Sequence, residues 1–384
     1  MNIDFTEPSF SDVLRDLRGH EATSYMLSLV AIMAGLDVTF YRSQRDANWN
    51  HPLFAQKFNT ATFFKVSDGK RSHFFNGSQS DRTSRAAALA SRDKLKTKAL
   101  LHRNNLNTPA GGIVSAGDYG LLSSLYKAGV RRFVIKPTEG SLGAGVLLLQ
   151  TAQQVLDVLQ ANPNQAYLLE QHIMGNEFRV YVVDRTPVHA YQVIPNHVLG
   201  NGRDTVRTLH AVRFEQRKVN PFFGARDVHY ASAEIALLSR GFSWDYIPAV
   251  KEIVWLAADQ IPDSSSDMLP ILPKLSEEAR LLAVDAARSV AAFNCAVDMI
   301  MDSKGVPYVL EVNIRAYITQ HCFPMPSTLY NIDVPTSLIK AHFGSMNTDQ
   351  RKVTGFDFAA LRTNLFQKDQ PPQGVRAADF AVFQ

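Results

Sequence analysis

The stretch FVIKPTEGSLGAGVLLLQ, residues 133–150, carries a lysine at the end of one apolar run and a glycine-rich loop before a second apolar run. Such runs, bounded by proline and glycine, predict two strands joined by the loop. Glycines let backbone N–H groups approach phosphate oxygens, and Lys136 adds positive charge. The order differs from the GxxxxGK[ST] phosphate loop, because the lysine precedes the glycines. Taken alone, the stretch fits a phosphate site or an ordinary tight turn equally well.

The bulk properties of the chain narrow its class. A length of 384 residues predicts two or three subdomains. The net charge of +4 is spread without a polybasic tail, and no apolar run reaches 18 residues, so we expect neither a nucleic-acid nor a membrane partner. The start, MNIDFTEPSF, does not resemble a signal peptide. With only Cys295 and Cys322, a disulfide framework is excluded and a cytoplasmic location is expected.

Helical and strand patterns mix along the whole chain, which indicates an α/β or α+β protein. Residues 91–106, SRDKLKTKALLHRNNL, predict a helix opened by Ser91. Residues 61–75, ATFFKVSDGKRSHFF, predict a hairpin with Asp-Gly at its turn. Residues 262–273 are polar, and we expect them to be an excursion outside the core.

A second hairpin is predicted near the C-terminus by AVDMIMDSKGVPYVLEVN. A four-residue turn at 302–305 would set Asp298 opposite Val309. Side chains alternate along a strand, so Glu311 and Asn313 would share the face of Asp298, whereas a register slip of one residue would reverse that face. Carboxylate and amide oxygens gathered beside apolar neighbours favour Mg²⁺; the alternative is a set of chance polar residues on a solvated face.

Together these patterns resemble the ATP-grasp superfamily. Lys98 in DKLKTKALL comes first, Lys136 precedes the Gly-rich loop, a hinge strand LLEQHIMGNEFRV follows, and the acidic LEVN segment comes last. The chain is more specifically similar to the ATP-grasp domain of cyanophycin synthetases and of bifunctional glutamate–cysteine ligase/glutathione synthetases. That similarity lies in RVYVVDRTPVHAYQVIPNHVLGNGRDTVRTL and EVNIRAYITQHCFPMP, and the whole resemblance spans residues 85–343.

The resemblance implies an α/β (α+β) ATP-grasp fold of three subdomains, with ATP held between two antiparallel sheets. The implied divisions are an N-terminal domain at 1–108, a central lid domain at 109–175, a C-terminal domain with the Mg²⁺ site at 176–343 and an extension at 344–384. A homodimer is the assembly that the superfamily implies. The extension could pack across a neighbouring subunit or lie loose.

The resemblance also implies roles for single residues. Lys98 and Lys136 would contact the α- and β-phosphates of ATP. A mobile loop would cover the phosphates; it includes Ser141, Gly143 and Gly145. The adenine would be lined by Glu170, Gln171, His172 and Ile173. Glu170 would take the exocyclic amine, and Glu177 would bind the ribose hydroxyls. One or two Mg²⁺ ions, with Mn²⁺ as an alternative, would be held by Asp298, Glu311 and Asn313.

The implied reaction joins a carboxylate to an amine, with amino acids or peptides as the expected substrates. The carboxylate attacks the γ-phosphate of ATP to give an acyl phosphate and ADP, and the amine then displaces phosphate. Two other readings stay open. One is a kinase on the same fold, and the other is a non-catalytic protein that binds nucleotides, since fold does not fix function.

One segment departs from the pattern of the relatives. They carry an arginine and an Asn-x-Ser-x-Gly-Gly loop where this chain has Ala257 or Ala258 and no Gly-Gly. Arginine pairs bidentately with carboxylate or phosphate, so another arginine could replace the missing cation. Three are candidates, each otherwise expected on the surface: Arg315, Arg213 and Arg217. His197 lies in a segment that faces the site in the relatives and is a further candidate.

Overall fold

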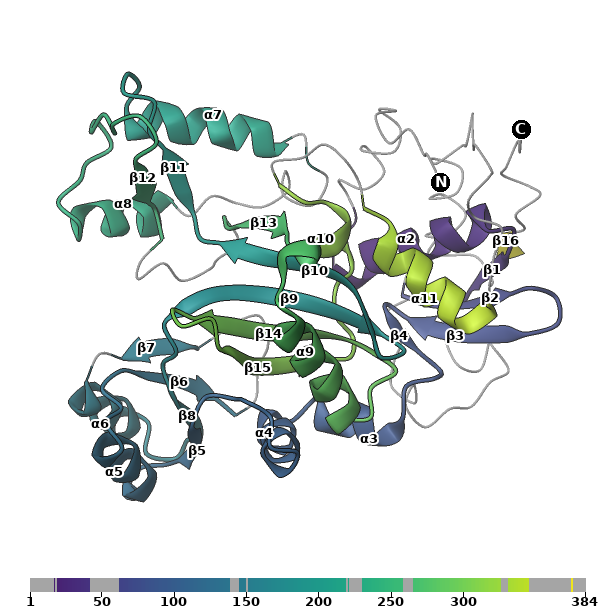
Figure 1. Cartoon of the computed structure of the whole chain (residues 1–384), viewed down its shortest axis with the longest axis horizontal. Helices are drawn as coiled ribbons and strands as arrows, with labels where there is room; N and C mark the ends of the chain where they lie inside the picture. The colour runs from purple at the N-terminus through teal and green to yellow at the C-terminus, as the bar shows by residue number, and fades with distance from the viewer. Residues whose placement is uncertain are drawn as a thin grey trace. The chain divides into compact units, whose positions relative to one another are not determined.

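In the computed structural model, the described residues are 17, 19–41, 62–138, 145–149, 151–218, 220, 230–257, 265–325, 331–344 and 374–375. They form two compact units, each built from separate stretches of chain (Figure 1). Unit 1 takes Met1–Asp81, Val188–Pro273 and Arg315–Gln384, and unit 2 takes Arg82–Pro187 and Lys274–Ile314. Among the described residues, no helix has the length and apolar character needed to span a bilayer.

Unit 2 contains a four-stranded antiparallel sheet in the order β5-β8-β6-β7. Helices α5 and α6 cover one face of it (Figure 1). Phe133, Ile135 and Leu169 alternate inward from the strands and pack against Val155 and Leu159 of α6 in a fully buried core. The elements are α5 (Gly120–Lys127), α6 (Ala152–Ala161), β5 (Gly111–Val114), β6 (Phe133–Pro137), β7 (Leu147–Leu149) and β8 (Tyr167–Gln171).

Helices α3 (Arg85–Ala90) and α4 (Lys94–Arg103) precede this sheet. The expectation that Ser91 opens the second helix is wrong, because Ser91 is the C-cap of α3. Asp93 is the N-cap of α4: its Oδ1 accepts from the N–H groups of Leu95 and Lys96 at 3.0 and 3.1 Å. A carboxylate satisfies these exposed donors and opposes the positive helix end, which explains the shift of two residues.

The second sheet of unit 2 pairs β14 (Asn294–Asp302) with β9 (Gly175–Val183) on one side and β15 (Pro307–Asn313) on the other, all antiparallel. Helix α9 (Glu277–Ser289) packs against all three strands. Its N-cap is Ser276, which accepts from the N–H of Ala279. Strand β9 ends in a two-residue turn at Asp184 and Arg185, both with positive φ, before β10 begins.

The predicted hairpin register at β14 and β15 is wrong by one residue near the turn, because Met301 pairs with Pro307 rather than Val306. This register alone would put Asp298 on the face opposite Glu311. A bulge between Asp298 and Met299 adds one residue, and Asp298 then pairs directly with Glu311. Such a bulge shifts the alternation of the following residues. The two carboxylates therefore share a face, as expected, through a different register.

Unit 1 has a sheet in the order β16-β1-β2-β3-β4, and helices α2 and α11 pack together over it. All residues from Ala22 to Met33 of α2 are buried, so the helix is enclosed on every side. The predicted hairpin turns at Asp68 and Gly69, as expected. The elements are α2 (Gly19–Met33), β1 (Asp37–Phe40), β2 (Phe63–Ser67), β3 (Ser72–Asn76), β4 (Gln79–Ser80), α10 (Thr319–Cys322), α11 (Asp333–Phe343) and β16 (Gly374–Val375).

Within the part of unit 1 that runs from Val188 to Pro273, β10 pairs with β13. Part of the predicted polar excursion is therefore a paired strand, since β13 begins at Asp267 opposite Ile194. Between them lies a lobe with its own small core, which includes Val198, Leu237 and Val254. The elements are β10 (Thr186–Ile194), β11 (His197–Leu199), α7 (Val206–Lys218), α8 (Tyr230–Leu238), β12 (Ile253–Trp255) and β13 (Asp267–Pro270).

The predicted mixture of helices and antiparallel sheets is confirmed. Each strand pairing that the structure gives for the described residues is antiparallel. The α+β alternative therefore holds. The domain limits after residues 108, 175 and 343 remain predictions.

Candidate functional site

Two lysines of unit 2 meet on one buried carboxylate. The Nζ of Lys98 lies 2.6 Å from Oε1 of Glu170, and the Nζ of Lys136 lies 2.6 Å from Oε2. Lys98 also donates to the carbonyl oxygen of Pro109 at 2.6 Å. The Glu170 side chain is only 4% exposed, and those of Lys98 and Lys136 are 7% and 15% exposed. Two cations against one anion leave a buried surplus of positive charge.

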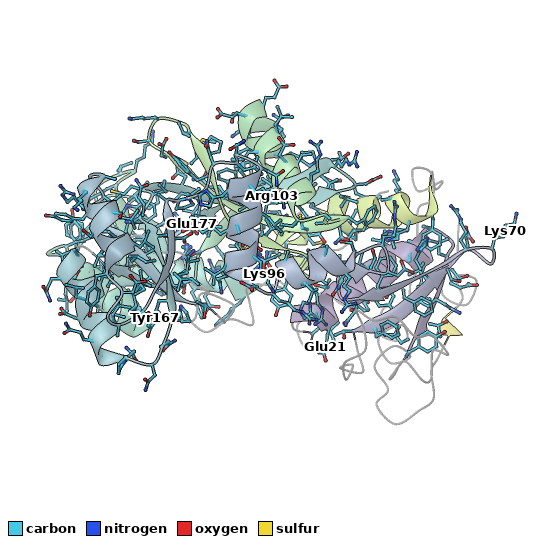
Figure 2. The ribbon with its side chains drawn as sticks, turned by 90° about the horizontal axis from the view of Figure 1, so that it is seen from below. Glu21, Lys70, Lys96, Arg103, Tyr167 and Glu177 are labelled. Atoms are coloured by element: carbon cyan, nitrogen blue, oxygen red, sulfur yellow. The ribbon has the colours of Figure 1, made fainter. Side chains whose placement is uncertain are left out.

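The sheet and α4 explain why these three side chains converge. Val134 of β6 pairs with Glu170 of β8, and Lys136 lies two residues further along β6, so it shares the face of Glu170. Lys98 turns inward from α4, whereas Lys96 and Arg103 of the same helix are exposed; both are labelled in Figure 2 and locate α4 there.

Burial and ion pairing together shift the pKa values of Glu170 and Lys98. Burial by itself would raise the pKa of Glu170, but attraction to Lys136 and Lys98 outweighs it and lowers that pKa below its usual value. Burial lowers the pKa of Lys98, and its pairing with Glu170 partly opposes this. Each of the two buried charges thus depends on the other, since an unpaired buried charge is costly.

A close backbone approach beside Glu170 requires glycine. Gly111 of β5 pairs with Glu170, and a Cβ at Gly111 would lie 2.2 Å from the carbonyl oxygen of Leu169 and 2.9 Å from the Cγ of Glu170. The sequence analysis missed this residue; its signal was the pair Gly111-Gly112, which opens β5.

The predicted adenine-lining segment begins at the end of β8. Gln171 donates its backbone N–H to Ala110 at 2.7 Å, and His172 donates its own to Arg132 at 3.0 Å. Ile173 is buried. The carboxylate of Glu170 is engaged by the two lysines, and its contact with an exocyclic amine remains a prediction.

The predicted mobile loop lies between β6 and β7, whose pairing of Ile135 with Leu147 brings its two ends side by side. Ser141 and Gly143 lie outside the described residues. Gly145 is described and has φ +74°, a left-handed conformation; a Cβ there would lie 2.8 Å from the Cγ of Pro137.

A cluster of acidic side chains forms on one face of β9, β14 and β15. Asp298 pairs across strands with Glu311 and with Arg179, while Glu177 of β9 pairs with Ile300, two residues from Asp298. Glu177 is labelled in Figure 2. The carboxylates of Glu177, Asp298 and Glu311 therefore share a face, as the alternation of strand side chains requires.

Asp298 is held on two sides. The guanidinium of Arg179 donates to both carboxylate oxygens of Asp298, from Nη2 to Oδ2 at 2.8 Å and from Nε to Oδ1. The amide nitrogen of Asn313 donates to Oδ2 at 2.9 Å, so the carbonyl oxygen of Asn313 is the atom that could bind a cation. Arg179 was missed in the sequence; its position two residues after Glu177 was the available signal.

The pKa values of two of these carboxyls show a site short of positive charge. Burial and then repulsion from Asp298 raise the pKa of Glu177 to about 7. The same two causes, in the same order, raise the pKa of Glu311. Lys136 lowers both, so the lysine pair and the acidic cluster lie within electrostatic reach of each other in unit 2. A divalent cation with oxygen ligands would offset this repulsion, so the residues fit Mg²⁺.

The predicted catalytic residues all lie in unit 1. Arg213 and Arg217 of α7 converge on Oδ1 of Asp267, at 2.9 and 2.5 Å. Both also donate to the carbonyl oxygen of Ser265, at 3.2 and 2.8 Å. They therefore hold the start of β13 in place. Asp267, which anchors them, was not predicted.

The other two catalytic candidates have local partners. The Nδ1 of His197 donates to the carbonyl oxygen of Pro195 at 2.9 Å, because a carbonyl oxygen can only accept. Burial lowers the pKa of His197, with Arg213 adding repulsion. Arg315 donates to Oδ1 of Asn76 at 2.6 Å. Roles for these residues in chemistry remain predictions.

Comparison with known proteins adds three findings. Residues 91–203 match the family model described as RimK-like ATP-grasp domain. The chain is 25% identical over 266 residues to the "Glutathione biosynthesis bifunctional protein GshAB" of Listeria welshimeri, covering 64% of this chain and 34% of that protein. The protein of the same name from Clostridium perfringens is 25% identical over 287 residues, covering 68% and 36%. The chain thus spans about a third of the length of these relatives.

Solved structures share the fold of this chain. The crystal structure of a bifunctional glutathione synthetase from Pasteurella multocida superimposes with a TM-score of 0.55 at 20% identity, covering 73% of this chain and 40% of that one. The similarity shows a shared fold.

Proposed function

Because this chain carries a RimK-like ATP-grasp domain, we propose that it is an ATP-dependent, ADP-forming ligase that joins a carboxylate to an amine. The observation that carries the proposal is the buried cation surplus of Lys98 and Lys136 around Glu170. It lies within electrostatic reach of an acidic cluster in which the pKa values of Glu177 and Glu311 are raised. The first feature suits phosphates and the second suits Mg²⁺, and phosphoryl transfer requires both in one place.

In the proposed reaction, a substrate carboxylate oxygen attacks the γ-phosphorus of ATP, and ADP leaves. An amine nitrogen then attacks the acyl carbon of the acyl phosphate, phosphate leaves and the amine loses a proton. Lys98 and Lys136 would hold the α- and β-phosphates, and Glu170 keeps both ammonium groups at fixed positions. Preorganised cations stabilise the charge on the transferring group without reorganising during the reaction.

Asp298, Glu311 and Asn313 would hold Mg²⁺, which supplies positive charge to the phosphates. The same acidic face carries Glu177, whose proposed contact is with the ribose hydroxyls. Arg179 orients Asp298 through its bidentate pair. Ser141, Gly143 and Gly145 would cover the phosphates and keep water from the acyl phosphate. Amino acids or peptides are the proposed substrates, and a cytoplasmic location and a homodimer are proposed from the superfamily.

The test is release of ADP and phosphate with Mg²⁺ across a panel of amino acids and dipeptides, with mass spectrometry of the products. Wild type is compared with Glu311→Ala and with Asp285→Ala, an exposed residue of α9 that pairs with Arg288. We expect an amide product from wild type and Asp285→Ala, and none from Glu311→Ala.

Hydroxylamine separates the ligase from a kinase. An acyl phosphate reacts with it to give a hydroxamate, whereas a phosphorylated hydroxyl group does not. ADP release with a phosphorylated product and no hydroxamate would replace the ligase proposal with the kinase. ATP binding without turnover of any substrate pair would favour a non-catalytic nucleotide-binding protein.

A further inference from the structure

A group of metal-ligating side chains lies in unit 1, apart from the residues of the proposed ligase site. His73 of β3, Asp81 just after β4 and His342 of α11 each offer a ligand atom, and these atoms all lie within 4.8 Å of one another. Among the described residues, this is the one group of three or more His, Cys, Asp or Glu that meets this distance. Asp81 and His342 are 261 positions apart in sequence, so the fold alone brings them together.

The Asp81 carboxylate is held in place. Its Oδ2 accepts from the backbone N–H of Phe74 at 2.9 Å, and its Oδ1 lies 3.0 Å from Nδ1 of His73. Zn²⁺ binds nitrogen and carboxylate oxygen at about 2.0–2.2 Å, so neighbouring ligand atoms of a tetrahedral site stand about 3.3 Å apart. The separation of His73 and Asp81 is already close to that spacing.

His342 has the support that metal-binding histidines usually have. Its Nδ1 lies 2.7 Å from the carbonyl oxygen of Leu338, and a carbonyl only accepts, so Nδ1 carries the proton. The lone pair for a metal then belongs to Nε2. A ring N–H donated to a backbone carbonyl is the usual outer contact that fixes the tautomer of a metal ligand.

The position of the ring is fixed as well. His342 is buried, with its ring centroid 4.9 Å from that of Phe75 and 4.9 Å from that of His73. Arg71 donates to the carbonyl oxygen of Phe343 at 2.6 Å and so ties the end of α11 to the start of β3. The three ligands therefore come from strand β3, from the residue after β4 and from the end of α11.

We propose that His73, Asp81 and His342 form a binding site for a divalent transition-metal ion of the Zn²⁺ class. Two imidazoles and one carboxylate favour such an ion, whereas Mg²⁺ and Ca²⁺ prefer oxygen ligands alone. The side chains of His73 and Asp81 are 23% and 18% exposed, which lets water complete the coordination. The ion links the end of α11 to β3 and β4 and stabilises unit 1.

The test uses the full chain, stripped of metal with a chelator and then kept in excess Mg²⁺ so that the acidic cluster of unit 2 is occupied. Zn²⁺ is titrated by calorimetry, and Co²⁺ reports tetrahedral coordination through its visible absorption. We expect one equivalent of Zn²⁺ to bind and to raise the midpoint of thermal unfolding. His73→Ala and Asp81→Asn should weaken binding at least about tenfold, since even outer contacts of a metal are worth that much.

His102→Ala is the matched control, because His102 is an exposed histidine on α4. It should bind Zn²⁺ as wild type does. His342→Ala is a third variant; should it fail to fold, His73→Ala and Asp81→Asn still decide the matter. Absence of Zn²⁺ binding by wild type, or equal affinity in His73→Ala, Asp81→Asn and wild type, would overturn the site. The cluster would then be an ion pair of His73 with Asp81 packed against His342.

Discussion

Glu170 holds both of the lysines that are proposed to bind phosphate, because each of its carboxylate oxygens is paired with a different ammonium group. Its replacement tests the site without removing either proposed phosphate contact. In Glu170→Gln, Lys98 stays buried and loses its counter-charge. Breaking a buried pair by removing one partner costs about 3–5 kcal/mol.

We therefore expect Glu170→Gln to lower the free energy of unfolding by about 3 kcal/mol, measured by urea denaturation. ATP should restore part of the loss, since its phosphates supply negative charge to the same lysines. Asp285→Asn removes an exposed pair with Arg288 and should cost less than about 1 kcal/mol. A loss as small as this in Glu170→Gln would show that the lysines are not held by Glu170.

The raised pKa of Glu177 predicts that the free energy of unfolding depends on pH. Its pKa is about 7 in the folded chain against an ordinary value of 4.5, so the folded state binds more protons between pH 4.5 and 7. Stability therefore falls as pH rises through that window. Without Mg²⁺, Glu177→Gln should be more stable than wild type at pH 8, by about 1–2 kcal/mol, and the difference should shrink toward pH 4.5.

Removal of the Glu177 carboxylate should also change how Mg²⁺ binding depends on pH. We expect Mg²⁺ to bind wild type more tightly as pH rises from 6 to 8, because Glu177 loses its proton, and we expect this rise to be smaller in Glu177→Gln. Calorimetric titration at several pH values measures it. Glu215→Gln, which alters an exposed pair with Lys218, should follow wild type throughout. A Glu177→Gln variant with the wild-type pH profile of stability would contradict the raised pKa.

At the scale of elements, the contact between β5 and β8 positions the lysine pair. Gly111→Ala places a Cβ 2.2 Å from the carbonyl oxygen of Leu169, which forces the strands apart at Glu170. We expect Gly111→Ala to lower the unfolding midpoint and to weaken ATP binding at least about tenfold, through displacement of Glu170, since one carboxylate holds both lysines.

Gly120→Ala supplies the control for that change. Its Cβ would lie at an ordinary 3.5 Å from Oδ1 of Asp118, and Gly120 is the first residue of α5, where alanine has the higher helix propensity. Its stability should equal or exceed that of wild type by up to about 1 kcal/mol. Equal ATP affinity in Gly111→Ala and Gly120→Ala would show that the contact between β5 and β8 does not position the lysine pair.

The bulge between β14 and β15 changes which residues of the two strands pair. Alternation correctly predicted that Asp298, Glu311 and Asn313 share a face, but the predicted turn did not give the observed register. Two deviations of one residue, one at the turn and one at the bulge, add to a shift of two residues, which leaves the shared face unchanged. Bulges re-aim side chains and leave little trace in a single sequence, so the pairing of Asp298 with Glu311 could not be derived from it.

At the scale of the whole molecule, the proposed nucleotide and Mg²⁺ residues belong to unit 2, and the lobe between β10 and β13 belongs to unit 1. Because Ile194 pairs with Asp267, residues 195–266 can be replaced by a short turn that joins the two strands. The lobe has its own core around Val198 and Val254.

We expect this lobe-deleted variant to bind ATP and Mg²⁺ within about threefold of wild type, or about 0.7 kcal/mol, measured by calorimetry. Amide formation should be lost, because Arg213, Arg217 and His197 are removed. Loss of ATP binding by a variant that still unfolds cooperatively would show that the residues of unit 2 are not sufficient. Retained ligation would show that the catalytic role proposed for the three lobe residues is wrong.

The resemblance to ATP-grasp ligases, read from the lysines, the glycine loop and the LEVN segment, is confirmed by the family match and by the fold. These features were predictable because each rests on local order: strand alternation, turn glycines and residue types suited to phosphate or Mg²⁺. The contacts made by Arg179, Gly111 and Asp267 were not predictable from local signals, since each residue acts on a partner far away in sequence.

The sequence by itself determined the mixture of helices and strands and the residues that are proposed to meet a nucleotide and Mg²⁺, because periodicity and side-chain chemistry are local properties. Tertiary structure alone decided that one carboxylate holds both lysines, that a bulge sets Asp298 against Glu311, and that His73, Asp81 and His342 converge. These arrangements depend on strand register and on contacts between distant segments, and both are fixed by packing of the whole chain.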